Sequence, residues 1–349
     1  MSPAVFSFTV DRDAARQRVD RVLAAMGTWG TRSQVQRLIA LGLVRIDGVT
    51  AKAGTVLRGG QRVEVDPAPT LLPHAVEPAA IPLDVLYEDE WLLVINKPPG
   101  LVVHPAPGHW QGTLVSALLH RWRGRVRDLD PLRPGIVHRL DKDTSGVLLI
   151  AKDAATLAEM ARQFRTREIS KEYLALVWGS LPHPRGEISR PIARHPVHRK
   201  QMSIRVGGRP AVTRYEVVAA RDGVSRLRVW PQTGRTHQIR VHLASIGHAI
   251  VGDPVYGGRP ARAAEIGVTR PALHAAALSF RHPRTGEPTQ VAAPVAADLL
   301  DACERLGLSS LTSRIPFVSV STRNAPRPST AAPRALRRAA RPSRHASPS

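Results

Sequence analysis

The sequence predicts an α+β fold with a small basic module at the N-terminus and a larger module built on a mainly antiparallel sheet. Residues 13–66 follow the order helix, helix, strands, and residues 67–82 form a Pro-rich linker without periodicity. Residues 83–308 alternate strands with a few helices, and strand-like runs such as LALVWG, VTRYEVV and SRLRVWP favour antiparallel pairing. The chain has 349 residues, 43% of them apolar, which is enough for two or three packed domains.

The overall charge points to a polyanionic partner. The chain carries 50 Lys and Arg residues against 28 Asp and Glu, a formal net charge of +22, and such a surface attracts nucleic acid. A generally Arg-rich composition or a membrane-binding patch would give the same excess. The single cysteine, Cys303, forms no internal disulfide, and the sequence shows neither a signal peptide nor an apolar run long enough to span a membrane. We therefore expect a soluble, cytoplasmic protein.

The N-terminal module begins with a strand-like VFSFTV. Residues 13–26 place apolar side chains at helical spacing, and a second helix follows that Gly42 is positioned to end in a left-handed cap. A strand then enters a tight Asp47-Gly48 turn, and QRVEVD reads as a further alternating strand.

This order, with RSQVQRLIALGLVRIDG at its centre, resembles the S4 RNA-binding domain. The resemblance implies that basic side chains of the two helices bind RNA. Those candidates are Arg18, Arg21, Arg32 and Arg37. The alternative is that they form only a solvated helix face.

A polar loop in the larger module is the first candidate for chemistry. PGIVHRLDKDTSGVLLIAK, residues 134–152, predicts an apolar strand, a charged loop and a second apolar strand. Asp141 lies in that loop, and the hydroxyls and backbone N–H groups of Thr144, Ser145 and Gly146 are expected to stabilise its ionised carboxylate. The alternative is that Asp141 or Asp143 only organises a turn.

Two further segments carry candidate side chains. In QTGRTHQIRVHLASIGH the spacing predicts a helix near 236–246 with Thr236 as its N-cap, and Arg240 lies one residue off its apolar stripe. We expect Arg240 to pair bidentately with Asp141. Histidines 237 and 242 are five residues apart and face different sides, so no metal site is expected. ISKEYLALVWG predicts a strand in which Tyr173 could simply be packed.

Four motifs in order, HRLDKDTSG, SKEYLALVWG, TGRTHQIRVH and VGDPVYGG, behind an S4-like module, resemble the RluA family of pseudouridine synthases, most closely its RluD-type members. The resemblance implies a central mixed, mainly antiparallel sheet crossed by an RNA-binding cleft. It also implies that Asp141 is the catalytic aspartate, Tyr173 contacts the target base, Arg240 pairs with Asp141, and Arg139 fills the space left by the flipped nucleotide. Residues 230–232, Trp-Pro-Gln, depart from the family pattern, which leaves fine substrate contacts open.

The implied reaction breaks the N1–C1′ bond of uridine, rotates the uracil and joins C5 to C1′, and it needs no cofactor. Asp141 could attack C1′, add to C6 or remove a ribose proton, and Tyr173 could stack on the uracil or remove the C5 proton. We expect phosphate contacts from Arg194, Arg199 and Lys200. The family pattern points to ribosomal RNA, of the large subunit or its precursor, as the partner.

Residues 313–349 contain eight arginines and no acid and are predicted to form a disordered basic tail. Two other functions compete with the synthase. One is a non-catalytic S4-type RNA-binding or ribosome-assembly factor, and the other is a hydrolase that uses Asp141 with Asp143. Nothing in the sequence requires more than a monomer.

Overall fold

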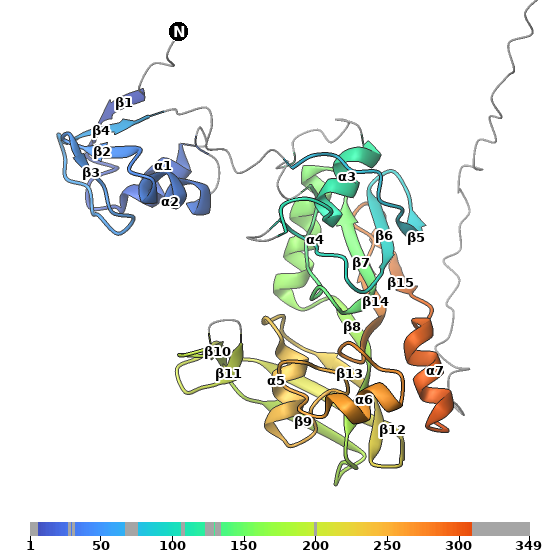
Figure 1. Ribbon diagram of the computed structural model, residues 1–349. Coiled ribbons are helices and arrows are strands. Elements are labelled where there is room, and N and C mark those ends of the chain that lie inside the picture. Colours follow the sequence, from blue (N-terminus) through green and yellow to red (C-terminus); the bar gives the residue numbers. More distant parts are fainter. Residues whose placement is uncertain are drawn as a thin grey trace, which may run out of the picture. The chain divides into compact units, whose positions relative to one another are not determined.

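The computed structural model describes residues 6–26, 29, 32–66, 76–105, 109–122, 129, 134–198 and 201–308. The chain divides into two compact units (Figure 1). The first comprises residues up to 80 together with 104–121, and the second comprises 81–103 together with the chain from 122 onward. The predicted 13–66, 67–82 and 83–308 boundaries stay a prediction, and the tail at 313–349 lies outside the described residues.

The first unit contains a four-stranded antiparallel sheet in the order β1-β4-β2-β3 and the helices α1 and α2. The bounds are β1 Phe6–Thr9, α1 Val19–Ala25, α2 Arg32–Ala40, β2 Val44–Ile46, β3 Val49–Thr50 and β4 Arg62–Val65. In β2 and β4, buried and more exposed side chains alternate, so one face of the sheet packs with the helices around an aliphatic core. A further helix, α3, spans Leu114–Trp122.

Local signals in this unit had mixed outcomes. Gly42 adopts φ +75° after α2, and the Asp47-Gly48 turn has φ +50° and +79°, so the predicted cap and tight turn are confirmed. The prediction of a helix over 13–26 was wrong in its first half, because α1 begins only at Val19. Arg16 takes a left-handed φ of +65° just before it, which interrupts a helical path.

The second unit is built on a nine-stranded sheet in the order β5-β6-β7-β14-β8-β13-β12-β9, with β15 pairing with β14. Only β7 and β14 pair in parallel, which confirms the predicted mixed, mainly antiparallel sheet. The strands are β5 Asp84–Glu88, β6 Leu92–Lys97, β7 Ser145–Ala151, β8 Ser170–Trp178, β9 Arg185–Ser189, β12 Val212–Arg221, β13 Val224–Pro231, β14 Leu273–Arg281 and β15 Pro288–Ala292.

Helices and a hairpin complete this unit. The helices are α4 Ala154–Thr166, α5 Gln238–Ser245, α6 Pro260–Glu265 and α7 Ala297–Arg305, and the hairpin pairs β10 Ile192–Arg194 with β11 Met202–Ile204. Every residue of β7 is buried, as expected of a strand near the centre of the sheet. Within the described residues, no helix has the length and apolar character to cross a membrane.

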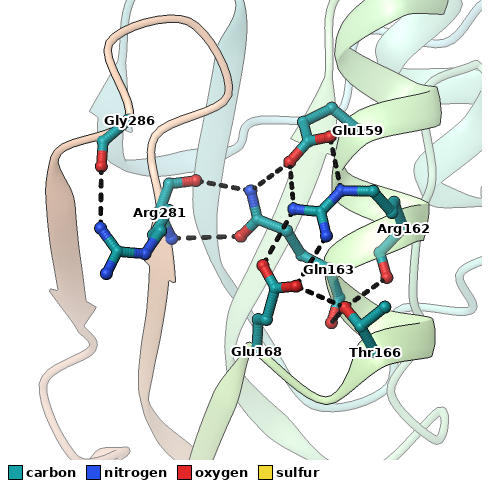
Figure 2. A network of polar contacts seen from close by, with 7 residues as sticks. All are labelled: Glu159, Arg162, Gln163, Thr166, Glu168, Arg281 and Gly286. Carbon is teal, nitrogen blue, oxygen red and sulfur yellow. Dashed lines mark hydrogen bonds and ion pairs between the residues drawn. The ribbon is translucent and has the colours of Figure 1, made fainter.

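A polar network fixes the end of α4 to the β14–β15 hairpin (Figure 2). The buried side-chain amide of Gln163 donates to the backbone carbonyl of Arg281 at 2.9 Å and accepts from the Arg281 N–H at 3.1 Å. Arg162 donates to the carboxylates of both Glu159 and Glu168. These contacts hold in place the segment that leads from α4 into β8.

Candidate active site

A cleft of about 490 Å³ lies within the second unit. Its lining comes from the loop that precedes β7, from the end of α4 and the start of β8, and from the loop that precedes α5. Asp141, Tyr173, Arg240 and Arg139 all line it. Four residues that the sequence places up to 101 positions apart therefore meet at one cavity, and their individual roles stay predictions.

Asp141 is held on one side by Arg240. Nη1 of Arg240 donates to Oδ2 of Asp141 at 3.2 Å. The other two guanidinium nitrogens donate to Asp253, Nε to Oδ2 at 2.7 Å and Nη2 to Oδ1 at 2.8 Å. The side chain of Asp253 is fully buried and that of Arg240 is 7% exposed, so the pair is shielded from solvent, whereas Asp141 remains 23% exposed toward the cleft.

This geometry corrects two predictions about Asp141. Arg240 does not pair bidentately with it, because the planar fork of Arg240 is already taken by Asp253. The side chains of Thr144 and Ser145 do not stabilise the carboxylate either. Thr144 donates its N–H to the backbone carbonyl of Asp141, and Ser145 Oγ contacts His274 and Arg270.

His237 is the second group beside the carboxylate, with Nε2 3.9 Å from Oδ2 of Asp141. Its Nδ1 lies 3.0 Å from the hydroxyl of Tyr256, which already accepts the N–H of Met202 at 2.8 Å. The hydroxyl of Tyr256 therefore donates its own proton to Nδ1 of His237. In this tautomer the ring proton of His237 is on Nε2, which faces Asp141. Burial lowers the pKa of His237, against the opposing effect of Asp141, so the ring is neutral.

Both contacts approach Oδ2, so Oδ1 of Asp141 is the oxygen left for a substrate.

The helix near 236–246 spans Gln238–Ser245, and its N-cap is His237 in a left-handed conformation, φ +53°, rather than Thr236. The Gln238 side chain accepts from the N–H of Arg235 and the hydroxyl of Thr233, which ties the preceding loop to α5.

Tyr173 lies on β8 and lines the same cleft. Burial, reinforced by the nearby charge of Asp141, raises the pKa of its phenol. The side chain therefore stays protonated at neutral pH and offers a flat aromatic face rather than a base.

The loop that carries Asp141 is positioned from behind by two cations. Lys97 is fully buried, and its Nζ donates to the carbonyls of Pro98, Leu101 and Lys142 at 2.7, 3.0 and 2.9 Å. Burial lowers the pKa of Lys97 to about 7, yet the three acceptors match the three N–H bonds of the ammonium form. Arg270 donates to the carbonyl of Asp143.

The residues around this loop depart from the prediction in one respect. The sequence predicts a strand over PGIV, residues 134–137, but within it only Ile136 makes an isolated bridge, to Ile150, and the regular strand begins at Ser145. Gly146 follows at φ +109°, and a Cβ there would lie 2.1 Å from the carbonyl oxygen of Ala275. Only glycine allows β7 and β14 to approach so closely at this point.

The cleft is strongly basic. Asp141 is the only acid in its lining, against six arginine or lysine side chains, namely Arg139, Arg165, Arg167, Lys171, Arg235 and Arg240. Arginines on the outer surface of the sheet are mostly paired, as Arg214 is with Glu187 and Arg228 is with Glu172. Arg240 is neutralised by Asp253, whereas the other five cleft cations pair with no carboxylate among the described residues. Such a group of cations along a cavity is the electrostatic pattern of a polyanion site.

The RNA-binding candidates of the first unit are partly engaged within the chain. Arg18 and Arg32 both pair with the buried carboxylate of Asp20, at 3.0 and 2.9 Å. Each keeps more than two fifths of its side chain exposed, so the rest of the group is free to contact a ligand. Arg21 is exposed on α1, and the side chain of Arg37 lies outside the described residues. Their roles in RNA binding stay predictions.

The other predicted RNA contacts belong to the β10–β11 hairpin. Arg194 is exposed at the end of β10, while Arg199 and Lys200 lie outside the described residues. The hairpin is connected to the site through β11, because the backbone N–H of Met202 donates a hydrogen bond to the hydroxyl of Tyr256. In the described part of the chain, no group of three or more His, Cys, Asp or Glu side chains is arranged to hold a metal.

Sequence reasoning missed Asp253, Tyr256 and Lys97. Asp253 and Tyr256 lie in VGDPVYGG and Lys97 in INKPPG, two motifs that carried the family resemblance without a role for each side chain. The sequence did contain a signal for Asp253 and Lys97, because each is a charged residue beside proline in a largely apolar stretch. A charge that is buried in such a stretch requires a partner.

Comparisons with known proteins show which families the chain is similar to. A family model described as RNA pseudouridylate synthase matches residues 91–245, and a model of the S4 domain matches residues 17–63. Ribosomal large subunit pseudouridine synthase D of Xanthomonas campestris pv. campestris is 43% identical over 304 residues, 83% of this chain and 89% of the relative. The protein of the same name in Escherichia coli K12 is 40% identical over 306 residues, 85% of this chain and 92% of the relative.

Two solved human structures are also similar. RNA Pseudouridylate Synthase Domain Containing 1 is 31% identical with a TM-score of 0.50, covering 63% of this chain and 86% of the human one. Domain Containing 4 is 25% identical with a TM-score of 0.52, covering 64% and 93%.

Proposed function

The chain belongs to the RNA pseudouridylate synthase family, and on that premise we propose that it converts particular uridines of large-subunit ribosomal RNA, or of its precursor, to pseudouridine. The choice of RNA is supported by the relatives from Xanthomonas and Escherichia, whose names specify the large ribosomal subunit. The observation that carries the choice of catalytic group is the one-sided contact of Arg240 with Asp141, which leaves Oδ1 without a hydrogen bond from the described residues, in a basic cleft.

The conversion of uridine to pseudouridine requires one ionised carboxylate and no cofactor. Uridine loses its N1–C1′ bond, the uracil rotates, C5 bonds to C1′, the C5 proton departs and N1 takes up a proton. Attack on C1′, addition to C6 and removal of a ribose proton all use an unprotonated carboxylate oxygen. Arg240 holds Asp141 in place by donating to Oδ2 at 3.2 Å, and it keeps a permanent positive charge beside the carboxylate.

Tyr173 is proposed to hold the uracil after its bond to the sugar breaks. Its phenol is kept protonated by burial, which supports stacking on the base rather than removal of the C5 proton. The target must first leave its helical stack, at a cost of a few kcal/mol. Arg139 is exposed and lines the cleft, which supports the proposal that its guanidinium fills the space left by the extruded nucleotide.

Phosphate contacts are proposed to supply most of the affinity. The cleft cations, the S4-like unit and the β10–β11 hairpin with Arg194, Arg199 and Lys200 would contact the backbone, while loops and unpaired bases give selectivity. A monomer is proposed as the working form, since nothing in the sequence requires a second copy. Ribosomal RNA as substrate supports a cytoplasmic location.

The direct test is tritium release from C5-labelled uridine in ribosomal RNA transcripts, followed by mapping of pseudouridine. Release with pseudouridine at defined positions would support the proposal. RNA binding without release from transcripts or precursor subunits would favour the non-catalytic RNA-binding or ribosome-assembly factor. Free uracil as product, together with a requirement for Asp143, would favour the hydrolase.

A further inference from the structure

Lys171 lines the cleft, but it does not contact Asp141 and it forms no ion pair among the described residues. It lies on β8 two residues before Tyr173, so the two side chains point to the same face of the strand, and both line the cleft. Arg139, Arg165 and Arg167 are exposed, whereas Lys171 is half-buried. Its ammonium is therefore deeper in the cleft than these three arginines and on the side where the base is held.

The hydrogen bonds of Lys171 are incomplete. Its Nζ donates to the carbonyl of Thr233 at 3.2 Å, and no carboxylate of the described residues pairs with it. An ammonium has three N–H bonds, and Lys97 in the same unit finds three carbonyl acceptors for them. Two N–H groups of this half-buried ammonium are therefore available to donate to acceptor atoms of a ligand in the cleft.

The surroundings strengthen the field of this charge. Phe164 and Ile169 are apolar, and His138 is neutral because its Nε2 accepts the N–H of Leu149 at 2.9 Å and burial lowers its pKa to about 3. Burial lowers the pKa of Lys171 to about 8, which still leaves it protonated at neutral pH. Because Lys171 is partly shielded from water, its interaction with a developing anion is stronger than in bulk solvent.

Resting on the proposed function, we propose that Lys171 is a further catalytic residue, whose ammonium donates to a carbonyl oxygen of the target uracil and stabilises the negative charge that the ring acquires. When the N1–C1′ bond breaks, its electron pair stays on the uracil and spreads over O2 and O4. Elimination across the ribose leaves the same anion, and addition of Asp141 to C6 places the charge on the C5–C4–O4 enolate. The role of Lys171 is therefore common to all three routes, and Lys171 itself transfers no proton.

A phosphate is the other acceptor that could meet Lys171. The position beside Tyr173, behind the exposed arginines, favours the base over the backbone. The two cases differ experimentally, because a backbone contact is made equally before and during the reaction, whereas a contact to the uracil anion strengthens only as charge develops.

The test compares Lys171→Met, Lys171→Gln and Lys171→Arg with the wild type. Because the ammonium meets one carbonyl and no carboxylate among the described residues, the neutral variants are expected to fold with unchanged or higher stability, checked by thermal unfolding. Arg214→Met is the matched control, since it removes an exposed positive charge from β12, outside the cleft. Saturated single-turnover rates and RNA dissociation constants are measured on a transcript that the wild type converts.

We expect the neutral variants to slow the single-turnover rate on the order of a hundredfold, with RNA affinity changed by no more than about twofold. Lys171→Arg should retain part of the rate and Arg214→Met all of it. A normal rate in the neutral variants, or weaker RNA binding with a normal rate, would overturn the proposal.

A substrate with 5-fluorouridine at the target position separates catalysis from mere positioning. Fluorine withdraws electrons and stabilises the uracil anion, so the missing ammonium matters less. The deficit of Lys171→Met, followed as disappearance of 5-fluorouridine from nuclease digests, should shrink by at least about tenfold. An equal deficit on both substrates would contradict the proposal. A wild type that converts neither substrate would refute the proposed function instead, because the Lys171 test is a ratio to wild-type activity.

Discussion

Arg240 and Asp253 form a buried bidentate ion pair, and only one guanidinium nitrogen of Arg240 remains for Asp141. Tyr256 adds its ring beneath the same guanidinium, 5.2 Å from its central carbon. Arg240 is thus fixed by a carboxylate that faces away from the substrate. The position of Asp141 therefore depends on Asp253, a buried carboxylate that does not line the cleft.

Replacing Asp253 with Asn should damage both stability and turnover. The buried guanidinium would lose its main counter-charge, which lowers the free energy of unfolding by about 3 kcal/mol. The single-turnover rate should fall about tenfold or more, with RNA affinity retained, because Arg240 no longer has a fixed orientation. Urea unfolding and tritium release measure the two effects. Asp222→Asn, in an exposed pair with Arg221, is the control, and full turnover by Asp253→Asn would contradict this role.

Tyr173→Phe and Tyr173→Ala separate stacking from proton transfer. Phenylalanine keeps the aromatic face, so its single-turnover rate should stay within about threefold of wild type, whereas alanine should lose about ten- to a hundredfold. The same tritium assay reports both, since it follows the C5 proton itself. If phenylalanine were as slow as alanine, the hydroxyl would be required and the stacking role insufficient.

Asp20 should make the S4-like unit sensitive to acid. Burial by itself would raise the pKa of Asp20, but hydrogen bonds from Gln36, Arg18 and Arg32 outweigh it and lower the pKa to about 2. Because the folded pKa lies below the unfolded value of 3.8, the stabilisation is present above that value and is lost as pH falls toward 2.

Asp20→Asn should therefore destabilise the full chain at neutral pH, on the order of 2 kcal/mol, and the difference from wild type should vanish near pH 2. Urea unfolding of both proteins across this pH range is the measurement. A difference that did not change with pH would mean that packing, not charge, explains the effect.

Deleting residues 313–349 should weaken RNA binding without affecting the chemistry. The segment carries eight arginines and no acid, so its loss should flatten the dependence of log Kd on log salt, by up to about 0.9 for each phosphate contact removed. Single-turnover rates at saturating RNA should not change. Loss of turnover in the truncated protein would show that the segment takes part in the reaction.

The α+β class and mainly antiparallel pairing could be predicted from the sequence because apolar periodicity is a local property, and the mixed sheet was implied by the resemblance to the RluA family. Prediction from the sequence failed where a partner lies far along the chain. Asp253 follows Arg240 by 13 positions, yet only the fold shows that it, and not Asp141, receives the bidentate contact. Likewise, PGIV has the composition of a strand, but only Ile136 pairs.

For Lys171, the sequence predicts the face of the strand but not the role of the side chain. Alternation along β8 places it on the face of Tyr173, but a lysine in a strand is ordinarily solvated. Its functional meaning comes from the depth of the cleft and from the single carbonyl that meets its ammonium, and neither can be read from spacing.

The central claim is that Asp141 performs the reaction, and tritium release from C5-labelled ribosomal RNA transcripts tests it most directly. Wild type and Asp222→Asn should release tritium and form pseudouridine, while Asp141→Asn should bind the same RNA with near-normal affinity and release none. Release by Asp141→Asn at a rate comparable to wild type would contradict the account.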